Sequence, residues 1–179
     1  MIAFISGGCK NGKSTYAQNL AKSLCKTGKL CYVATMIPHD EEDDRRIARH
    51  LKEREGWGFE TVEQGTDIDG CVDRLGSGAT VLLDSVTALL SNEMFGPDGT
   101  FRPDAGIKTA QQLRSLCLAV DNIVLVSDYL YSDAQIYDEY TEAYRRGLAH
   151  VDRELAKLSD TVMEVCFGNI IFHRGELTI

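Results

Sequence analysis

A glycine-rich segment near the start of the sequence has the residue types that bind phosphate. Residues 7–14 (GGCKNGKS) fit the spacing G-x-x-x-x-G-K-S. The glycines let backbone N–H groups curve around a phosphate, while Lys13 can reach the β- and γ-phosphates and Ser14 can ligate Mg²⁺. A glycine-rich turn with a chance Lys-Ser pair is the alternative, but a predicted strand precedes the segment and a predicted helix follows it, as the motif requires. We therefore predict a nucleotide site, with Lys13 catalytic, at Gly7, Gly8, Cys9, Lys10, Asn11, Gly12, Lys13 and Ser14.

A second candidate metal ligand follows an apolar run later in the chain. Residues 81–84 (VLLD) end in a carboxylate, as a Walker B strand does, and such an acid holds Mg²⁺ directly or through water. The alternative is that Asp84 caps the next helix. With the phosphate motif present, we predict that Ser14 and Asp84 hold Mg²⁺. A signalling GTPase is disfavoured because the sequence has no N-K-x-D segment to read guanine.

Three basic side chains share a spacing that places them on one helix face. Arg46, His50 and Arg54 follow one another at intervals of four residues. A neutral imidazole can attack phosphorus, and flanking guanidinium groups can bind a polyphosphate with two hydrogen bonds each. From composition alone, the simpler interpretation is a solvated helix whose glutamates one turn earlier balance its charge. Ile47 and Leu51 form an adjacent apolar stripe that could dock this helix on the body of the protein.

Charge is distributed unevenly along the chain. There are 19 basic and 27 acidic residues, a net charge of −8, which disfavours a nucleic-acid partner. The first 38 residues nevertheless contain no Asp or Glu, and this cationic region suits a small anionic ligand. It carries Lys10, Lys13, Lys22, Lys26 and Lys29.

Other classes of protein receive little support. The apolar runs are much shorter than the ~20 residues that a membrane helix needs, so we expect no membrane span. The six cysteines form no C-x-x-C pair and the four histidines no H-x-x-x-H pair, which argues against zinc. Because the start of the sequence does not resemble a secretory signal, we expect reduced thiols and a cytoplasmic protein.

The elements that must position these residues alternate between strand and helix. The pattern predicts a single α/β domain over 1–179, with a mostly parallel sheet covered on both faces. A C-terminal β-hairpin closes it around Gly168-Asn169. Strands are expected at 2–6, 30–35, 61–64, 80–84 and 122–127, with the hairpin at 162–166 and 170–173. Helices are expected at 13–26, 40–54, 67–75, 85–95, 107–120 and 137–158. Residues 96–104 are expected to form a loop.

Taken in order, several segments resemble the adenosylcobinamide kinase/adenosylcobinamide-phosphate guanylyltransferase family of cobalamin biosynthesis. The resemblance spans nearly the whole chain, and the joint occurrence of the segments is far more specific than any one of them. The segments are GGCKNGKS (7–14), YVAT (32–35), RIARH (46–50) with Arg54 and Trp57, TVE (61–63) and LLDSVTALLSN (82–92).

This resemblance implies a P-loop domain with a RecA-like sheet that catalyses two reactions. A nucleoside triphosphate (ATP or GTP) phosphorylates the aminopropanol hydroxyl of adenosylcobinamide, and GMP is then transferred from GTP to the new phosphate through a guanylylated histidine. His50 corresponds to that histidine, which reverses the interpretation from composition. The resemblance also implies a homo-oligomer, a trimer with sites between subunits. It implies nucleotide contacts at the phosphate motif and at Thr35, Arg54, Glu63 and Asp84, to which the basic face adds Arg46.

The sequence also departs from the family pattern. Glu55 stands where the family has a proline after the arginine, and Ser127–Tyr131 (SDYLY) replaces a common N-E-V-G stretch. Two alternatives therefore stay open. The protein could be only a kinase, acting on cobinamide or another small alcohol, or it could be a nucleotide-binding regulator without chemistry.

Overall fold

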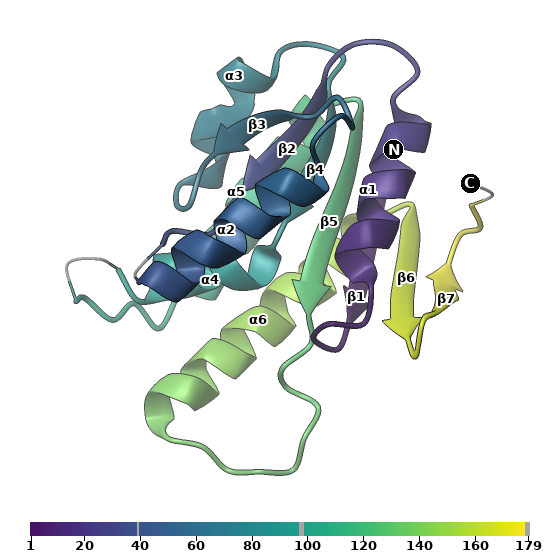
Figure 1. Cartoon of the computed structure of the whole chain (residues 1–179). Helices are drawn as coiled ribbons and strands as arrows, with labels where there is room; N and C mark the ends of the chain where they lie inside the picture. The colour runs from purple at the N-terminus through teal and green to yellow at the C-terminus, as the bar shows by residue number, and fades with distance from the viewer. Residues whose placement is uncertain (39, 97–98, 178–179) are drawn as a thin grey trace.

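Seven strands form one sheet in the order β3-β2-β4-β5-β1-β6-β7 (Figure 1). All neighbours pair in parallel except β7, which pairs antiparallel with β6. The computed structural model describes residues 1–38, 40–96 and 99–177, without the side chains of Asp44, Arg46, His50 and Glu53. The strands are β1 (Ile2–Gly7), β2 (Leu30–Ala34), β3 (Glu60–Glu63), β4 (Thr80–Asp84), β5 (Asn122–Asp128), β6 (Thr161–Cys166) and β7 (Asn169–Arg174).

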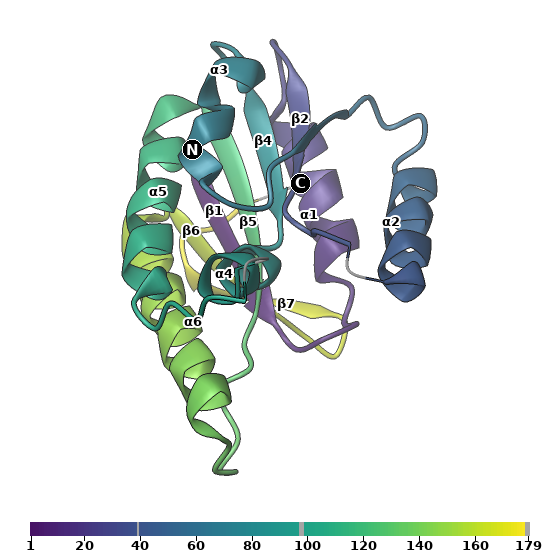
Figure 2. The same ribbon diagram turned by 90° about the vertical axis from the view of Figure 1, so that its left-hand side faces the viewer.

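Helices cover both faces of the sheet. Figure 2 shows α4, α5 and α6 on one side and α1 on the other, with α2 lying farther out beyond α1. This three-layer arrangement suits strands that are apolar on both faces. The helices are α1 (Lys13–Leu24), α2 (Glu41–Glu53), α3 (Val72–Leu75), α4 (Val86–Met94), α5 (Ala105–Ala119) and α6 (Glu139–Leu158), with a 3-10 helix, η1 (Ile68–Cys71), before α3.

Two apolar cores lie on opposite faces of the sheet. On the α1 face, Leu20 packs with alternate residues of the central strands, including Ile5 and Val124. The larger core lies under the helices of the other face, where Leu83 and Leu113 are fully buried. Burying side chains from both faces is the main favourable term that holds the sheet in place.

Helices α5 and α6 approach each other closely through two glycines. A Cβ added to Gly106 would lie 2.9 Å from the Cα of Gly147, so no other residue fits there without moving a backbone. Close packing of this pair fixes α6, which in turn positions the chain segment that precedes it.

The predicted fold is confirmed. The elements occur in the expected order, and β6 and β7 form the expected hairpin. The long helix predicted from Tyr137 begins two residues later, because the Asp138 side chain caps it by accepting from the backbone N–H groups of Tyr140 and Thr141. In the loop predicted at 96–104, positions 97 and 98 lie outside the described residues. Among the described helices, none combines the length and apolarity needed to cross a bilayer.

Candidate nucleotide site

The predicted phosphate loop, residues 7–14, lies at the carboxyl edge of the sheet. In open α/β sheets this edge is where ligands bind. The loop connects β1 to α1, and the first turn of α1 contains Lys13 and Ser14. Strand pairing sets Asp128 at the end of β5 directly beside Gly7. The end of β5 is therefore the closest neighbour of the loop on that side.

The loop backbone has the shape that its glycines allow. A Cβ on Gly7 would lie 2.5 Å from the carbonyl oxygen of Val165, so the close approach of β6 requires glycine there. Gly12, before α1, has φ 94°, and exposed Lys10 has φ 56°. The Asn11 amide donates to that same Val165 carbonyl and ties the loop to β6. Both sides of the loop are thus attached to the sheet.

Lys13 is held inside the loop by a carboxylate that the motifs did not predict. Only 5% of this lysine is exposed. Its ammonium group donates to the carbonyl of Gly8 at 2.6 Å and forms a 2.6 Å ion pair with Asp128. The Asn11 side-chain oxygen accepts from the same group at 3.4 Å. Lys13 is therefore already buried and directed into the cradle formed by the loop.

The two predicted magnesium ligands lie on different elements of the same edge. Ser14 is half-buried in α1, and Asp84 is half-buried at the end of β4. Hydroxyl and carboxylate oxygens are the donors that Mg²⁺ prefers, and this ion usually completes its shell with water and substrate phosphates. Among the described residues, no group of three or more His, Cys, Asp or Glu side chains could hold a metal. The donor set fits an ion bound together with a triphosphate.

Thr35 and Glu63 lie farther along the same edge. The Thr35 hydroxyl is fully buried, donates to the carbonyl of Ser85 at 2.7 Å and accepts from its N–H at 2.9 Å, so it links β2 to the residue after Asp84. Exposed Glu63 ends β3, four strand positions from β1. At the usual strand spacing this separation is roughly 19 Å. Glu63 can thus contact only the part of a nucleotide remote from the loop.

The basic face of α2 is described in part. Arg46 and His50 lie within this helix, but their side chains are outside the described residues. Arg54 follows the helix and is 7% exposed, with its guanidinium 3.5 Å from the centre of the Tyr32 ring. Its Nε and Nη1 are buried and have no hydrogen-bond partner among the described residues. Two such donors would accommodate an anion.

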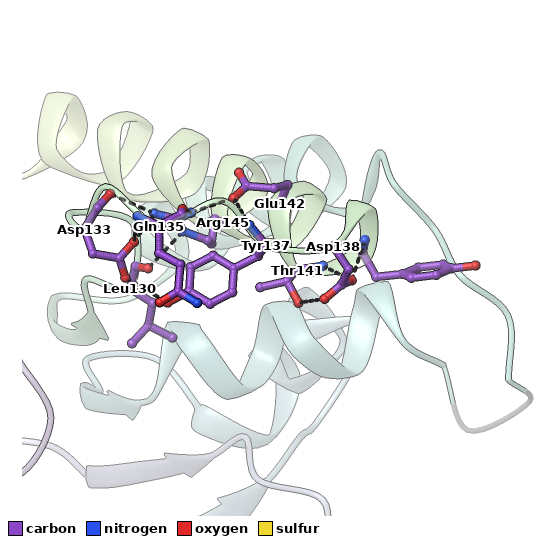
Figure 3. Close-up of polar contacts among 9 residues, drawn as sticks. Leu130, Asp133, Gln135, Tyr137, Asp138, Thr141, Glu142 and Arg145 are labelled. Atoms are coloured by element: carbon purple, nitrogen blue, oxygen red, sulfur yellow. Dashed lines mark hydrogen bonds and ion pairs between the residues drawn. The ribbon is translucent and has the colours of Figure 1, made fainter.

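One buried arginine fixes the chain segment between β5 and α6. Arg145 donates to the carbonyls of Leu130, Asp133 and Gln135, and forms ion pairs with the carboxylates of Asp133 and Glu142 at 3.0 and 2.6 Å. Figure 3 shows these acceptors gathered around its guanidinium. The Arg145 side chain therefore ties several points of the segment after Asp128 to α6.

This segment borders a groove of about 470 Å³ next to β1 and β6. In the groove, the Glu164 carboxylate accepts from the Tyr129 hydroxyl at 3.3 Å and lies 2.9 Å from the His173 ring. Burial and the adjacent carboxylate raise the pKa of Tyr129, so its hydroxyl stays a donor. The Tyr129 N–H donates to the Gly7 carbonyl at 3.3 Å, which joins the groove to the phosphate loop. The lining residues are Ser6, Tyr129, Tyr131, Ser132, Val162, Met163, Glu164 and His173.

Comparison with known families identifies the family to which this chain belongs. The model of the family described as "Cobinamide kinase / cobinamide phosphate guanyltransferase" matches residues 3–171. The chain belongs to this family. The match covers the phosphate loop, the basic face of α2, and the strands β4 and β5. It confirms the resemblance found in the sequence and places the protein in an enzyme family of cobinamide metabolism.

Comparison with solved structures supports the fold. A solved ATPase domain superposes with a TM-score of 0.53 over 91% of this chain and 68% of that chain, at 11% sequence identity. At this identity the likeness shows the fold alone, which is the predicted P-loop α/β sheet. A comparison with curated protein sequences gives no match.

Some of the predicted site residues lie close together in the structure, and others lie apart. The phosphate loop is compact around Lys13, and Asp84 and Glu63 share its edge of the sheet. Arg54 contacts Tyr32, in the middle of β2, rather than the loop. Sequence reasoning missed Asp128 because it ended the strand at Ser127. The available signal was the position itself, a carboxylate at the carboxyl end of a buried strand.

Proposed function

We propose that this protein phosphorylates adenosylcobinamide with a nucleoside triphosphate. It then transfers GMP from GTP to the product through a guanylylated His50, which gives adenosylcobinamide-GDP. The observation that carries this proposal is the buried Lys13 in a complete phosphate loop, in a chain that matches the family model over residues 3–171. ATP or GTP is the donor in the first step, and GTP is the donor in the second.

In the first step, the phosphate loop binds the triphosphate. Its backbone N–H groups and the start of α1 offer positive partial charge to the phosphates, and Lys13 turns from its protein partners to the β- and γ-phosphates. Ser14 and Asp84 would hold Mg²⁺, which neutralises charge on the phosphates when bound. These residues position the γ-phosphate for attack by the aminopropanol hydroxyl.

In the second step, a ring nitrogen of His50 attacks the α-phosphorus of GTP. The new N–P bond forms as the bond to pyrophosphate breaks. The phosphate of the first product then attacks the same phosphorus and releases His50. Arg54 supports this step because its buried guanidinium has two nitrogens without partners among the described residues, and guanidinium groups stabilise charge that develops on phosphate. Arg46 has the spacing to assist from the same helix face.

The proposal extends to assembly and location. We expect a homotrimer in which neighbouring subunits complete the sites, as the family resemblance implies. We also propose a cytoplasmic enzyme with no nucleic-acid partner.

The direct test is turnover with purified substrates. The protein is incubated with adenosylcobinamide and Mg²⁺ plus ATP, GTP or both, and the products are identified by mass spectrometry. Adenosylcobinamide phosphate followed by adenosylcobinamide-GDP supports the full proposal. Accumulation of the phosphate alone, in the presence of GTP, would instead support the kinase-only alternative. Nucleotide binding without either product would support a regulator.

A further inference from the structure

The Lys13–Asp128 ion pair places a carboxylate next to where the transferred phosphate must lie. The two charged atoms are 2.6 Å apart. When a triphosphate binds, Lys13 contacts the β- and γ-phosphates. A carboxylate that touches this lysine in the free protein is then within reach of the γ-phosphate and of any hydroxyl group that attacks it.

Asp128 is fixed at this position by the sheet. Its N–H donates to the Thr87 hydroxyl at 2.9 Å, and strand pairing aligns it with Gly7. Burial and, to a smaller extent, the charge of Asp128 raise the pKa of Asp152 and of Tyr144, two residues of α6. A carboxylate held on a strand end is more precisely positioned than one on a loop.

Two other carboxylates near the site are less well placed. Asp84 lies two strands from β1, roughly 10 Å away at normal strand spacing. Glu164 lies in the groove beside β6, where it accepts from Tyr129 and contacts His173. Asp128 is the one whose contact with Lys13 is direct.

The chain after Asp128 leads to an open groove that could admit the acceptor. Tyr129 joins the phosphate loop on one side and lines the groove on the other. The groove offers hydroxyl groups, a carboxylate and aromatic faces, which suit a large alcohol that carries hydrogen-bonding groups. An acceptor bound in the groove would lie beside Tyr129, the residue that follows Asp128.

We infer that Asp128 is a catalytic residue of the phosphorylation step, where its carboxylate accepts the proton of the acceptor hydroxyl. This inference rests on the proposed function. As the hydroxyl oxygen bonds to the γ-phosphorus, the bond from that phosphorus to the β-phosphate oxygen breaks. The hydroxyl proton passes to Asp128 and the nucleoside diphosphate leaves. The proton is later released to water, and the products are a phosphate monoester and the diphosphate.

The same ion pair links this base to nucleotide binding. In the free protein, Lys13 forms an ion pair with the Asp128 carboxylate. Bound phosphates draw Lys13 away, so Asp128 becomes available as a proton acceptor only when a phosphoryl donor is present. Removing the Asp128 carboxylate should therefore leave nucleotide affinity unchanged or increase it. The same change should slow phosphate transfer.

The test compares Asp128→Asn with Asp121→Asn, which changes an exposed aspartate at the other end of β5. Binding of a fluorescent GTP analogue and single-turnover phosphorylation of adenosylcobinamide are measured for both variants and the wild type. We expect Asp128→Asn to bind the analogue at least as tightly as wild type but to transfer phosphate roughly 100-fold or more slowly. Asp121→Asn should match wild type in both assays.

Several outcomes would overturn the inference. Transfer by Asp128→Asn within threefold of the wild-type rate would show that the carboxylate is not the base. A parallel loss of nucleotide binding would assign Asp128 to binding instead. If Asp128→Asn does not fold, Asp128→Ser is measured in the same two assays and judged by the same limits. Wild-type protein that leaves adenosylcobinamide unphosphorylated would overturn the proposed function as well, which distinguishes the two failures.

Discussion

The phosphate loop and helix α2 both carry candidate catalytic residues, but the protein holds them very differently. The side chains of Asn11 and Lys13 connect the loop to β6 and β5, and Lys13 is buried. By contrast, α2 lies outside the layer formed by α1 (Figure 2), and Leu51 is 49% exposed. The apolar stripe of this helix, Ile47 and Leu51, was expected to pack on the body of the protein and is thus only partly buried.

Among the described side chains, two contacts with the rest of the chain lie just after the carboxyl end of α2. Arg54 stacks on Tyr32, and Trp57 lies under the ammonium of Lys22 at 5.2 Å. Along the helix, Arg45 pairs with Glu41 at 2.9 Å, as expected, in a solvent-exposed pair that contributes little stability. The phosphate loop is thus attached directly to the sheet. The proposed nucleophile instead belongs to a helix that lies outside the α1 layer, where Leu51 is 49% exposed.

Substitution of Lys13 in the phosphate loop should give the largest loss of function. Lys13→Ala removes the ammonium from the loop and leaves the Asp128 carboxylate to repel phosphate. We expect nucleotide affinity to fall roughly 100- to 1,000-fold, with both transfer reactions reduced at least as much. Titration with a fluorescent GTP analogue measures this, and Lys13→Arg, which keeps the charge, should lose less. Affinity within threefold of wild type would contradict the role of this lysine.

A smaller effect is expected from releasing the segment after β5. Arg145→Ala leaves the Glu142 and Asp133 carboxylates and three backbone carbonyls without their donor. Breaking a buried, paired charge of this kind costs about 3 kcal/mol of unfolding free energy. Phosphorylation should also slow, because the segment that borders the acceptor groove is no longer fixed. Urea unfolding of this variant is compared with Arg146→Ala, an exposed neighbour, and equal stabilities would disprove the clamp.

A further expected effect concerns the pH dependence of stability and rests on Asp152 of α6. Burial raises its pKa to about 7, although the Tyr131 hydroxyl donates to it at 2.9 Å. The folded protein therefore keeps a proton that the unfolded chain releases near pH 4. Stability should fall as pH rises from about 4 to about 7, by at most about 4 kcal/mol.

Asp152→Asn removes this dependence. The variant should gain stability over wild type at pH 8, and the gain should shrink at pH 5, where wild-type Asp152 is neutral in the fold. Denaturant unfolding at pH 5, 6.5 and 8 measures the difference. A difference that stays constant across this range would mean that Asp152 does not titrate there.

The sequence was sufficient for the order of elements and for the phosphate loop. Apolar runs such as 80–84 and the amphipathic pattern of α6 are local signals, and the loop motif requires residues at fixed spacing. Asp128 could not be found this way. Its importance depends on β5 pairing with β1, a contact between segments more than 100 residues apart. Arg145 was missed for a similar reason, since its acceptors lie on an irregular segment without a periodic pattern.

The family resemblance identified His50 as the candidate nucleophile, which the residue spacing alone did not. Composition alone favoured a solvated helix for the face that carries His50, and the family match covers that helix. The assignment of His50 as nucleophile stays a prediction because its side chain lies outside the described residues.

The most direct test of GMP transfer through His50 is covalent labelling with GTP that carries ³²P at the α-phosphate. Wild-type protein should become labelled through a bond that acid cleaves and base does not, as a phosphoramidate requires. His50→Ala should take up no label yet still bind nucleotide through the phosphate loop, and the control His150→Ala should be labelled like wild type. Absence of label on wild-type protein, or label that survives in His50→Ala, would contradict the assignment of GMP transfer to α2.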